Sequence, residues 1–187
     1  YRPEGTITFN PRTSPSTSSE QAELSPACER GELVHFLLPM TLCTDSRVRD
    51  GQLIGDPTEG ALWVLAEKGG LDPEAKQEKQ PRIAEIPFDS GHKFMATFHQ
   101  VGATVEMFIK GAPDVLLERS TLNLAENGEQ LLDVPARAAI EAENEYLAAQ
   151  ALRVLAVARK IIPAADFDPV GDLWAWAEGW TFLGLAG

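Results

Sequence analysis

The chain has 187 residues, 44% of them hydrophobic, and carries a formal net charge of −12. The length and composition predict one globular domain with a real core, and the negative charge excludes non-specific binding to nucleic acid or to an anionic membrane surface. With two cysteines, three histidines and no apolar run near the roughly 20 residues of a membrane-spanning helix, we expect no disulfide framework, no metal cluster and no membrane span.

Residues 1–25 are rich in serine, threonine and proline, and we predict that they form a flexible arm or a segment near a hinge, with a strand-like start at "GTITF". We place the globular domain at residues 26–187. The apolar positions from Gly31 to Cys43 predict a short buried helix, in which Pro39 is expected to introduce a kink.

The segment "GDPTEGALWVLAEKGG" carries strong signals for both ends of a helix. Asp56 is the predicted N-cap, Pro57 the first helical residue and Gly69 the stop. Glu59, three residues after Asp56, is the predicted partner of Asp56 in a capping box. The glycine spacing from Gly55 imitates a phosphate-binding loop, but the lysine that such a loop requires is missing.

The stretch "RIAEIPF" predicts a strand that leads into a hairpin over residues 92–110, "HKFMATFHQVGATVEMFIK". Successive side chains of each strand are expected on opposite faces of the sheet. With a loop over residues 100–103, Lys93 would lie opposite Lys110. Like charges opposed across two strands repel, so the two lysines are either solvated at the end of the sheet or hold an anion between them.

Later elements follow the same kinds of signal. "GAPDVLLERS" predicts a turn and a short helix, "NLAENGEQLLD" a hairpin, and "LRVLAVARKI" and "WTFLGLAG" two strands. A longer helix is predicted from about Pro135 to Gln150, capped by Asp133. Strands mixed with helices, without a regular βαβ alternation, predict an α+β fold with a mainly antiparallel sheet. We find no motif that joins a catalytic nucleophile to a base.

Four stretches together resemble the nucleotide-binding domain of P-type cation-transporting ATPases, in the type II branch of calcium, sodium and proton pumps. They are "LCTDSRVRDGQLIGDPTEGAL", "IPFDSGHKFMATF", "FIKGAPDVLLERS" and "ALRVLAVARK". They occur in the family's order and span most of residues 40–160. The resemblance implies a sheet of about six or seven antiparallel strands flanked by helices, in a cytoplasmic domain of an integral membrane protein.

The resemblance assigns nucleotide-binding roles to Thr58, Glu59, Phe88, Lys93, Met95, Lys110, Gly111, Arg153 and Leu155. Phe88 would stack on adenine, Leu155 would pack on the other side of the base, and Glu59 would reach its edge. Thr58 and Met95 would line the pocket. Each main role has an ordinary alternative: Phe88 and Leu155 as core residues, and Glu59 as a helix-capping residue.

The resemblance also implies that Lys93, Lys110 and Arg153 form a local positive patch for the phosphates of a nucleotide. Ammonium groups act well as point charges in that task. Gly111 would permit close approach beside Lys110, and the alternative for Arg153 is a surface charge on an edge strand. Ser90 departs from the arginine that many calcium-pump relatives carry at this place, so we expect fewer phosphate contacts here.

The function implied is ATP binding: the domain holds adenine and phosphates for phosphoryl transfer to an aspartate on another domain. The family's DKTGT and TGE motifs do not occur in this sequence, so we expect ATP to be bound but not turned over, and magnesium to be held mainly by other domains. Expected partners are ATP and the phosphorylation and actuator domains of a pump. We expect no nucleic acid, no direct membrane contact and a monomeric isolated domain.

Two other functions are weighed against ATP binding. A regulatory or partner-binding α+β domain with little nucleotide affinity is compatible with Ser90 and with the acidity of the chain. A self-sufficient kinase or hydrolase is disfavoured, because neither a metal-binding nor a nucleophile constellation is found.

Overall fold

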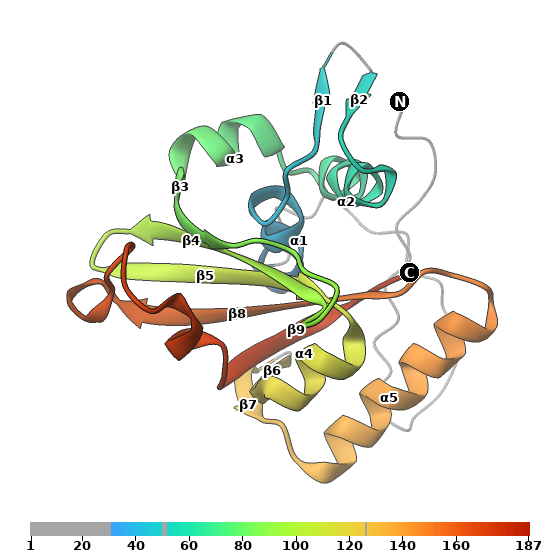
Figure 1. Ribbon diagram of the computed structural model, residues 1–187. Coiled ribbons are helices and arrows are strands. Elements are labelled where there is room, and N and C mark those ends of the chain that lie inside the picture. Colours follow the sequence, from blue (N-terminus) through green and yellow to red (C-terminus); the bar gives the residue numbers. More distant parts are fainter. Residues whose placement is uncertain (1–30, 50–51, 126) are drawn as a thin grey trace.

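A seven-stranded sheet with helices on both faces forms the body of the protein (Figure 1). The computed structural model describes residues 31–49, 52–125 and 127–187. The strands lie in the order β3 (Arg82–Ile86), β4 (Phe94–Val101), β5 (Thr104–Gly111), β8 (Leu155–Pro163), β9 (Trp180–Ala186), β6 (Ser120–Ala125) and β7 (Gly128–Leu131). Neighbouring strands are antiparallel except for β6 and β9, which are parallel. The expected α+β fold with a mainly antiparallel sheet is confirmed.

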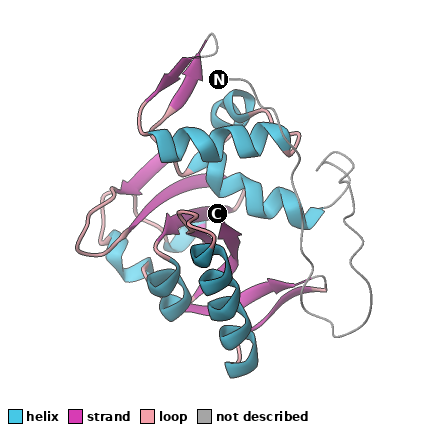
Figure 2. Ribbon diagram, turned by 90° about the vertical axis from the view of Figure 1, so that its right-hand side faces the viewer, coloured by secondary structure: helices cyan, strands magenta, loops and turns pink. Residues whose placement is uncertain are grey.

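The helices divide between the two faces of the sheet. Those on one face are α1 (Gly31–Leu42), α2 (Pro57–Lys68) and α3 (Pro73–Lys79), and those on the other are α4 (Pro113–Arg119) and α5 (Val134–Ala149). Figure 2 shows helices above and below the strands, with the two-stranded hairpin of β1 (Arg47–Arg49) and β2 (Gln52–Ile54) projecting from the top. None of the helices in the described ranges is long and apolar enough to cross a membrane.

Side chains of β4 alternate between the two faces of the sheet, as predicted, and the structure has a core on each face. Phe94 and Phe98 of β4 join a cluster with Trp180, on the face of α4. Met95, between them, joins a separate cluster with Cys43 at the end of α1. Because both faces of β4 and β5 are covered, the side chains of these strands are almost all buried.

The local signals for helices are confirmed. Asp56 caps α2 by accepting hydrogen bonds from the backbone N–H groups of Thr58 and Glu59, and Gly69 ends the helix. Asp133 caps α5 in the same way, through the N–H of Ala136. The helix with an internal Pro39 is α1, and the predicted late strands are β8 and β9.

The predicted register of the β4–β5 hairpin is wrong. Val101 pairs with Thr104 and Met95 pairs with Lys110, so the turn has two residues and Lys93 does not face Lys110. The physical reason is Gly102, whose φ of +60° permits a tight two-residue turn.

Some elements carried no clear signal in the sequence. They are the β1–β2 hairpin, helix α3, and the short 3-10 helices η2 (Ala164–Asp166) and η3 (Leu173–Trp176). The predicted arm at residues 1–25 lies outside the described residues, and so does its strand-like start.

Candidate functional site

The predicted site residues gather at one end of the sheet, where β4 and β8 begin and β5 ends. Lys110 and Gly111 are the last residues of β5, and Leu155 is the first of β8. The N-terminal turn of α2 approaches the same end, because Glu59 contacts Lys110. In Figure 1 this end lies near the beginning of α4.

The centre of this end is a buried ion pair. The ammonium of Lys110 contacts Oε1 of Glu59, and their side chains are only 8% and 17% exposed. The second carboxylate oxygen of Glu59 accepts hydrogen bonds from the N–H groups of Asp45 at 3.1 Å and Ser46 at 3.0 Å, and from the Ser46 hydroxyl at 2.9 Å. Both oxygens of this carboxylate are therefore held from several directions.

The surroundings of Glu59 favour its ionised form. Burial by itself would raise the pKa of Glu59, but the charge and hydrogen bond of Lys110, with those of Ser46 and Asp45, outweigh burial and lower it. The predicted capping box is wrong in its second half, because Glu59 reaches across to Lys110 rather than back to Asp56. A hydrogen bond from a buried, charged donor stabilises the carboxylate more than a hydrogen bond from an exposed backbone N–H does.

Lys93 lies in the loop before β4 and is more exposed than Lys110. Its backbone has a φ of +58°, and its N–H donates to the carbonyl of Asp89 at 2.8 Å. Its ammonium lies 3.8 Å from a carboxylate oxygen of Asp114, and the two side chains are 56% and 70% exposed. This is a solvated ion pair that a ligand can reach.

Gly111 is required by the close approach of two backbone segments. A Cβ on Gly111 would lie 2.4 Å from the carbonyl oxygen of Lys93 and 2.7 Å from Cα of Phe94. The same approach lets the N–H of Ala112 donate to the carbonyl of Lys93 at 3.0 Å. Gly111 thus joins the end of β5 to the loop that carries Lys93.

Three further predicted residues, Thr58, Arg153 and Leu155, lie around this end with different degrees of exposure. Arg153 is exposed between α5 and β8 and lies near Asp56. Hydrogen bonding by Thr58 lowers the pKa of Asp56, and the charge of Arg153 acts in the same direction. Leu155 is partly buried and packs against the α1–α2 cluster. These residues stand beside the ion pair rather than inside it.

Met95 lies in the core rather than on the surface of the site. Its side chain is 1% exposed and packs with Phe108 and Cys43. Because it is paired with Lys110 across the β4–β5 ladder, it lies beside the lysine on the same face of the sheet.

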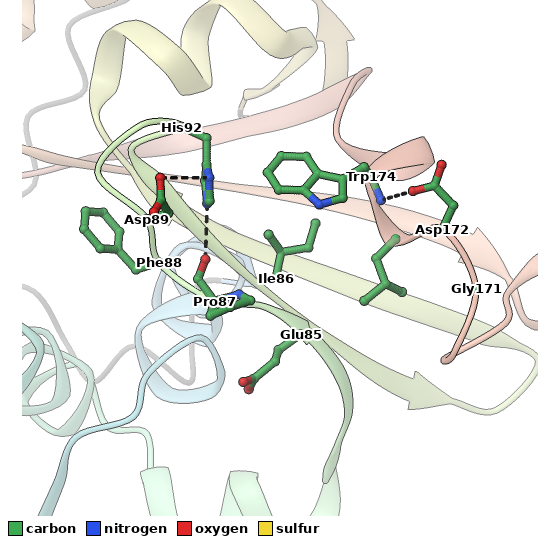
Figure 3. Close-up of a pocket in the computed structure, with 10 residues that line it drawn as sticks. Glu85, Ile86, Pro87, Phe88, Asp89, His92, Gly171, Asp172 and Trp174 are labelled. Atoms are coloured by element: carbon green, nitrogen blue, oxygen red, sulfur yellow. Dashed lines mark hydrogen bonds and ion pairs between the residues drawn. The ribbon is translucent and has the colours of Figure 1, made fainter.

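Phe88 is strongly exposed, with 63% of its surface accessible. It lies on the loop between β3 and β4, beside a cavity of about 450 Å³ whose other wall is the η3 segment. In Figure 3 Phe88 points away from Trp174, and His92 lies between them. An exposed aromatic ring on a structured loop can stack on a planar ligand.

The acidic partners of the predicted cations were missed. Glu59 faces Lys110, Asp114 faces Lys93, and Asp56 lies near Arg153. In the absence of a ligand the predicted positive patch is thus largely neutralised.

Sequence reasoning also missed the hydrogen-bond partner of Glu59 and the aromatic contact between His92 and Trp174. Ser46, within the stretch "LCTDSRVRDGQLIGDPTEGAL", is buried and bonds Glu59. His92 directly precedes Lys93, which could have drawn attention to it. Trp174 carries no local signal, because its role depends on contact with the distant loop.

Within the described parts of the chain, no group of three or more histidine, cysteine, aspartate or glutamate side chains could hold a metal ion. The carboxylates nearest the site are already engaged by Lys110, by Lys93 and by backbone N–H groups. The described residues therefore do not fit a magnesium site of their own.

The sequence profile of a family described as the P-type ATPase cytoplasmic domain N matches residues 32–187. The chain is 37% identical over 169 residues to calcium-transporting ATPase 1 of Lactococcus lactis, which covers 87% of this chain. It is 35% identical over 192 residues to the calcium-transporting ATPase of Bacillus subtilis, covering 100% of this chain. A third relative, cation-transporting ATPase pma1 of Synechocystis, is 38% identical over 160 residues and covers 83%.

The similarity covers only a part of each relative. The matched regions make up 19%, 20% and 17% of the three proteins. The chain thus spans about a fifth of the length of the curated relatives that it matches.

Proposed function

Because this chain belongs to the family of the cytoplasmic domain N of P-type ATPases, we propose that it is the ATP-binding domain of a type II cation pump. It holds adenine and phosphates and presents the γ-phosphate to an aspartate on another domain. Such phosphoryl transfer depends mainly on positioning and on neutralising charge, and this domain supplies the positioning.

The observation that carries the proposal is the exposure of Phe88 on the same loop that carries the exposed Lys93. With 63% of its surface in water, Phe88 is the most exposed aromatic residue in the part of the chain that the structure describes. Stacking a purine on this ring would contribute about 1–3 kcal/mol, as in other contacts between bases and aromatic side chains. The exposed ring therefore supports a planar ligand such as adenine.

The cations divide between the two ends of the nucleotide. Lys110 is buried against Glu59, and in this proposal the pair lies at the base end of the site. Glu59 would meet the base by sharing a carboxylate oxygen that already accepts hydrogen bonds. Lys93 and Arg153 are exposed, and they would meet the phosphates. This differs from the expectation of three cations converging on the phosphates.

The domain supplies binding and not the chemical step. Phosphoryl transfer by a P-type pump needs an aspartate nucleophile and magnesium, and the described residues do not fit a magnesium site. The partners in this proposal are ATP and the phosphorylation and actuator domains of the parent pump. The relatives named as calcium transporters make calcium one candidate for the transported ion.

The alternative is a regulatory domain of the same fold with little affinity for nucleotides. The neutralisation of Lys93 and Lys110 by Asp114 and Glu59 favours it, because phosphates would have to compete with carboxylates already in place. The exposed Phe88 favours the nucleotide site.

A nucleotide titration followed by NMR tests the proposal. With AMP, ADP and ATP added to the chain, we expect saturable shifts at Glu59, Phe88 and Lys93, with a Kd of about 1 mM, or about −4 kcal/mol. Affinity should rise with the number of phosphates. Absence of saturable shifts would favour the regulatory alternative, and steady phosphate release by the pure domain would contradict its role as a binding domain alone.

A further inference from the structure

We propose that His92 and Trp174 are positioning residues for the nucleotide site, because together they fix the loop that presents Phe88 and Lys93. This inference rests on the proposed function. Neither residue was assigned a role in binding. In Figure 3 His92 lies between Phe88 and Trp174, and all three line the same cavity.

Packing covers only a minor part of Phe88. It is 63% exposed, in contrast to Phe94 six residues further, which is fully buried. The position of the Phe88 ring therefore depends on the backbone of the loop. Whatever fixes that backbone also fixes the ring.

Hydrogen bonds within the loop define its shape. The carboxylate of Asp89 accepts from the N–H of Gly91 at 2.7 Å, and the carbonyl of Asp89 accepts from the N–H of Lys93 at 2.8 Å. These bonds lie between residues close in sequence. They shape the turn but do not determine how it sits against the rest of the domain.

His92 connects the loop to the body of the protein. Its Nε2 lies 3.2 Å from the carbonyl oxygen of Pro87, and its Nδ1 lies 3.7 Å from the carboxylate of Asp89. The ring also makes edge-to-face contacts, with centroids 4.7 Å from Phe94 and 4.9 Å from Trp174. Pro87 and Asp89, the two neighbours of Phe88, therefore both contact the imidazole of His92. The same imidazole packs against the rings of Phe94 and Trp174.

Trp174 supports His92 from the opposite wall of the cavity. It lies on η3, whose start is fixed by Asp172 accepting from the N–H of Trp174 at 3.0 Å. Its ring also meets the buried Phe94, with centroids 5.7 Å apart. Trp174 remains 48% exposed, so it is not a central core residue.

The consequence is a preorganised stacking surface. A loop that is already fixed loses less conformational freedom when a ligand binds. Removing the indole of Trp174 leaves His92 without one of its two aromatic contacts, and such contacts are worth enough to change affinity about two- to tenfold. The loss of affinity should be the same for every adenine nucleotide, because all of them would make the same contact between adenine and Phe88.

The test measures AMP and ATP affinity of the full chain with Trp174→Ala and Trp174→Phe. We expect Trp174→Ala to weaken both nucleotides by the same factor, about two- to tenfold, and Trp174→Phe to restore most of the affinity. Amide hydrogen exchange at Gly91 and Lys93 should quicken in Trp174→Ala. His92→Ala should reproduce these changes and is a second variant if Trp174→Ala folds poorly.

The matched control is Trp176→Ala, on the same 3-10 helix. Trp176 packs under Lys160, with the ammonium 5.6 Å from the centre of the ring, and not against the loop. We expect this control to lower the free energy of unfolding without a selective loss of nucleotide affinity. An equal loss of affinity in the control would overturn the inference.

A double-mutant cycle separates positioning from general stability. If Trp174 acts through Phe88, then Trp174→Ala should have no further effect on affinity in the Phe88→Ala variant. The inference would be overturned if Trp174→Ala lowered nucleotide affinity equally in the unmodified chain and in the Phe88→Ala variant. It would also be overturned if Phe88→Ala bound nucleotides weakly while Trp174→Ala bound them normally. If the unmodified chain binds neither nucleotide, it is the proposed function that fails, and the inference fails with it.

Discussion

The two lysines of the candidate site differ in nearly every physical respect. Lys110 is buried against Glu59, whose carboxylate is also held by backbone N–H groups and a hydroxyl. Lys93 is more than half exposed, and its partner Asp114 lies 3.8 Å away. One pair is part of the folded structure, and the other is a surface pair that water and salt can reach.

The difference teaches which residues serve folding and which are available to a ligand. A buried ion pair is strongly destabilised when one partner is removed, because the other is left charged and unpaired. An exposed pair contributes little, and its cation can exchange one anion for another. We therefore expect changes at Glu59 and Lys110 to affect stability first, and changes at Phe88 and Lys93 to affect binding first.

The largest expected effect is on stability, in Lys110→Met. Removal of this ammonium leaves the Glu59 carboxylate buried without its cation, which should lower the free energy of unfolding by about 3–5 kcal/mol. Urea unfolding measures it. The matched control, Lys93→Met, removes an exposed ammonium and should change stability by about 0.5 kcal/mol or less. Equal effects in the two variants would contradict the division between a buried and an exposed lysine.

The next effect is on binding, in Phe88→Ala. Loss of the stacking surface should weaken AMP and ATP alike by about 1–3 kcal/mol, with little change in stability because Phe88 is exposed. Isothermal titration calorimetry measures it. Ile161→Ala, which shortens an exposed side chain at the far end of β8, is the control and should bind as the unmodified chain does. If Phe88→Ala unfolds readily and binds normally, Phe88 belongs to the structure and not to the site.

A pH series tests the buried region separately from the ligand. Burial lowers the pKa of His99 below its ordinary value of 6.5, so as the pH falls below that value the unfolded chain takes up a proton that the folded chain resists. Stability should therefore fall from pH 7.5 towards pH 5.5. His35 shifts in the same direction, through burial and Arg159.

The slope of unfolding free energy against pH should be smaller in His99→Gln and smaller again when His35→Gln is added. Urea unfolding at several pH values gives these slopes. Glu59, with its pKa lowered from 4.5, adds to the loss of stability only at more acidic pH. An unchanged slope in the double variant would show that other groups govern the pH dependence.

The smallest effect is expected for Asp114→Asn. Releasing Lys93 from its surface partner and removing one negative charge near the phosphates should tighten ATP binding by about 0.2–1 kcal/mol, and AMP binding by less. The gain should shrink as salt is added, because exposed charges are screened. Glu118→Gln removes a charge from the same helix and serves as the control. Weaker ATP binding by Asp114→Asn would mean that Asp114 supports the site.

Much of the architecture could be predicted because its signals are local. The N-caps Asp56 and Asp133 and the stop at Gly69 indicate helix ends within a few residues. The alternation in "FMATF" predicts a strand, and the structure adds that both of its faces are buried. The hairpin register was wrong because a two-residue and a four-residue turn both suit the same pattern. Only the pairing of Val101 with Thr104 distinguishes them.

Less of the site could be predicted, because charges are neutralised by residues far apart in the chain. Glu59 and Lys110 are 51 positions apart, and nothing near Glu59 shows that it will leave its own helix cap for a distant lysine. The sequence did not decide whether Phe88 is buried or exposed, since a phenylalanine at the end of a strand is as compatible with the core as with a stacking surface.

The sequence by itself determined most of the helices and strands, though not the β1–β2 hairpin, α3 or the 3-10 helices. It also determined the family to which the chain belongs and the residue types gathered at the site, because these depend on local patterns and on similarity along the chain. The tertiary structure decided which carboxylate faces each cation, which lysine is buried, and that the ring of Trp174 contacts His92 on the loop of Phe88. The physical reason is that burial and ion pairing are properties of neighbours in space, and those neighbours come from distant strands and helices.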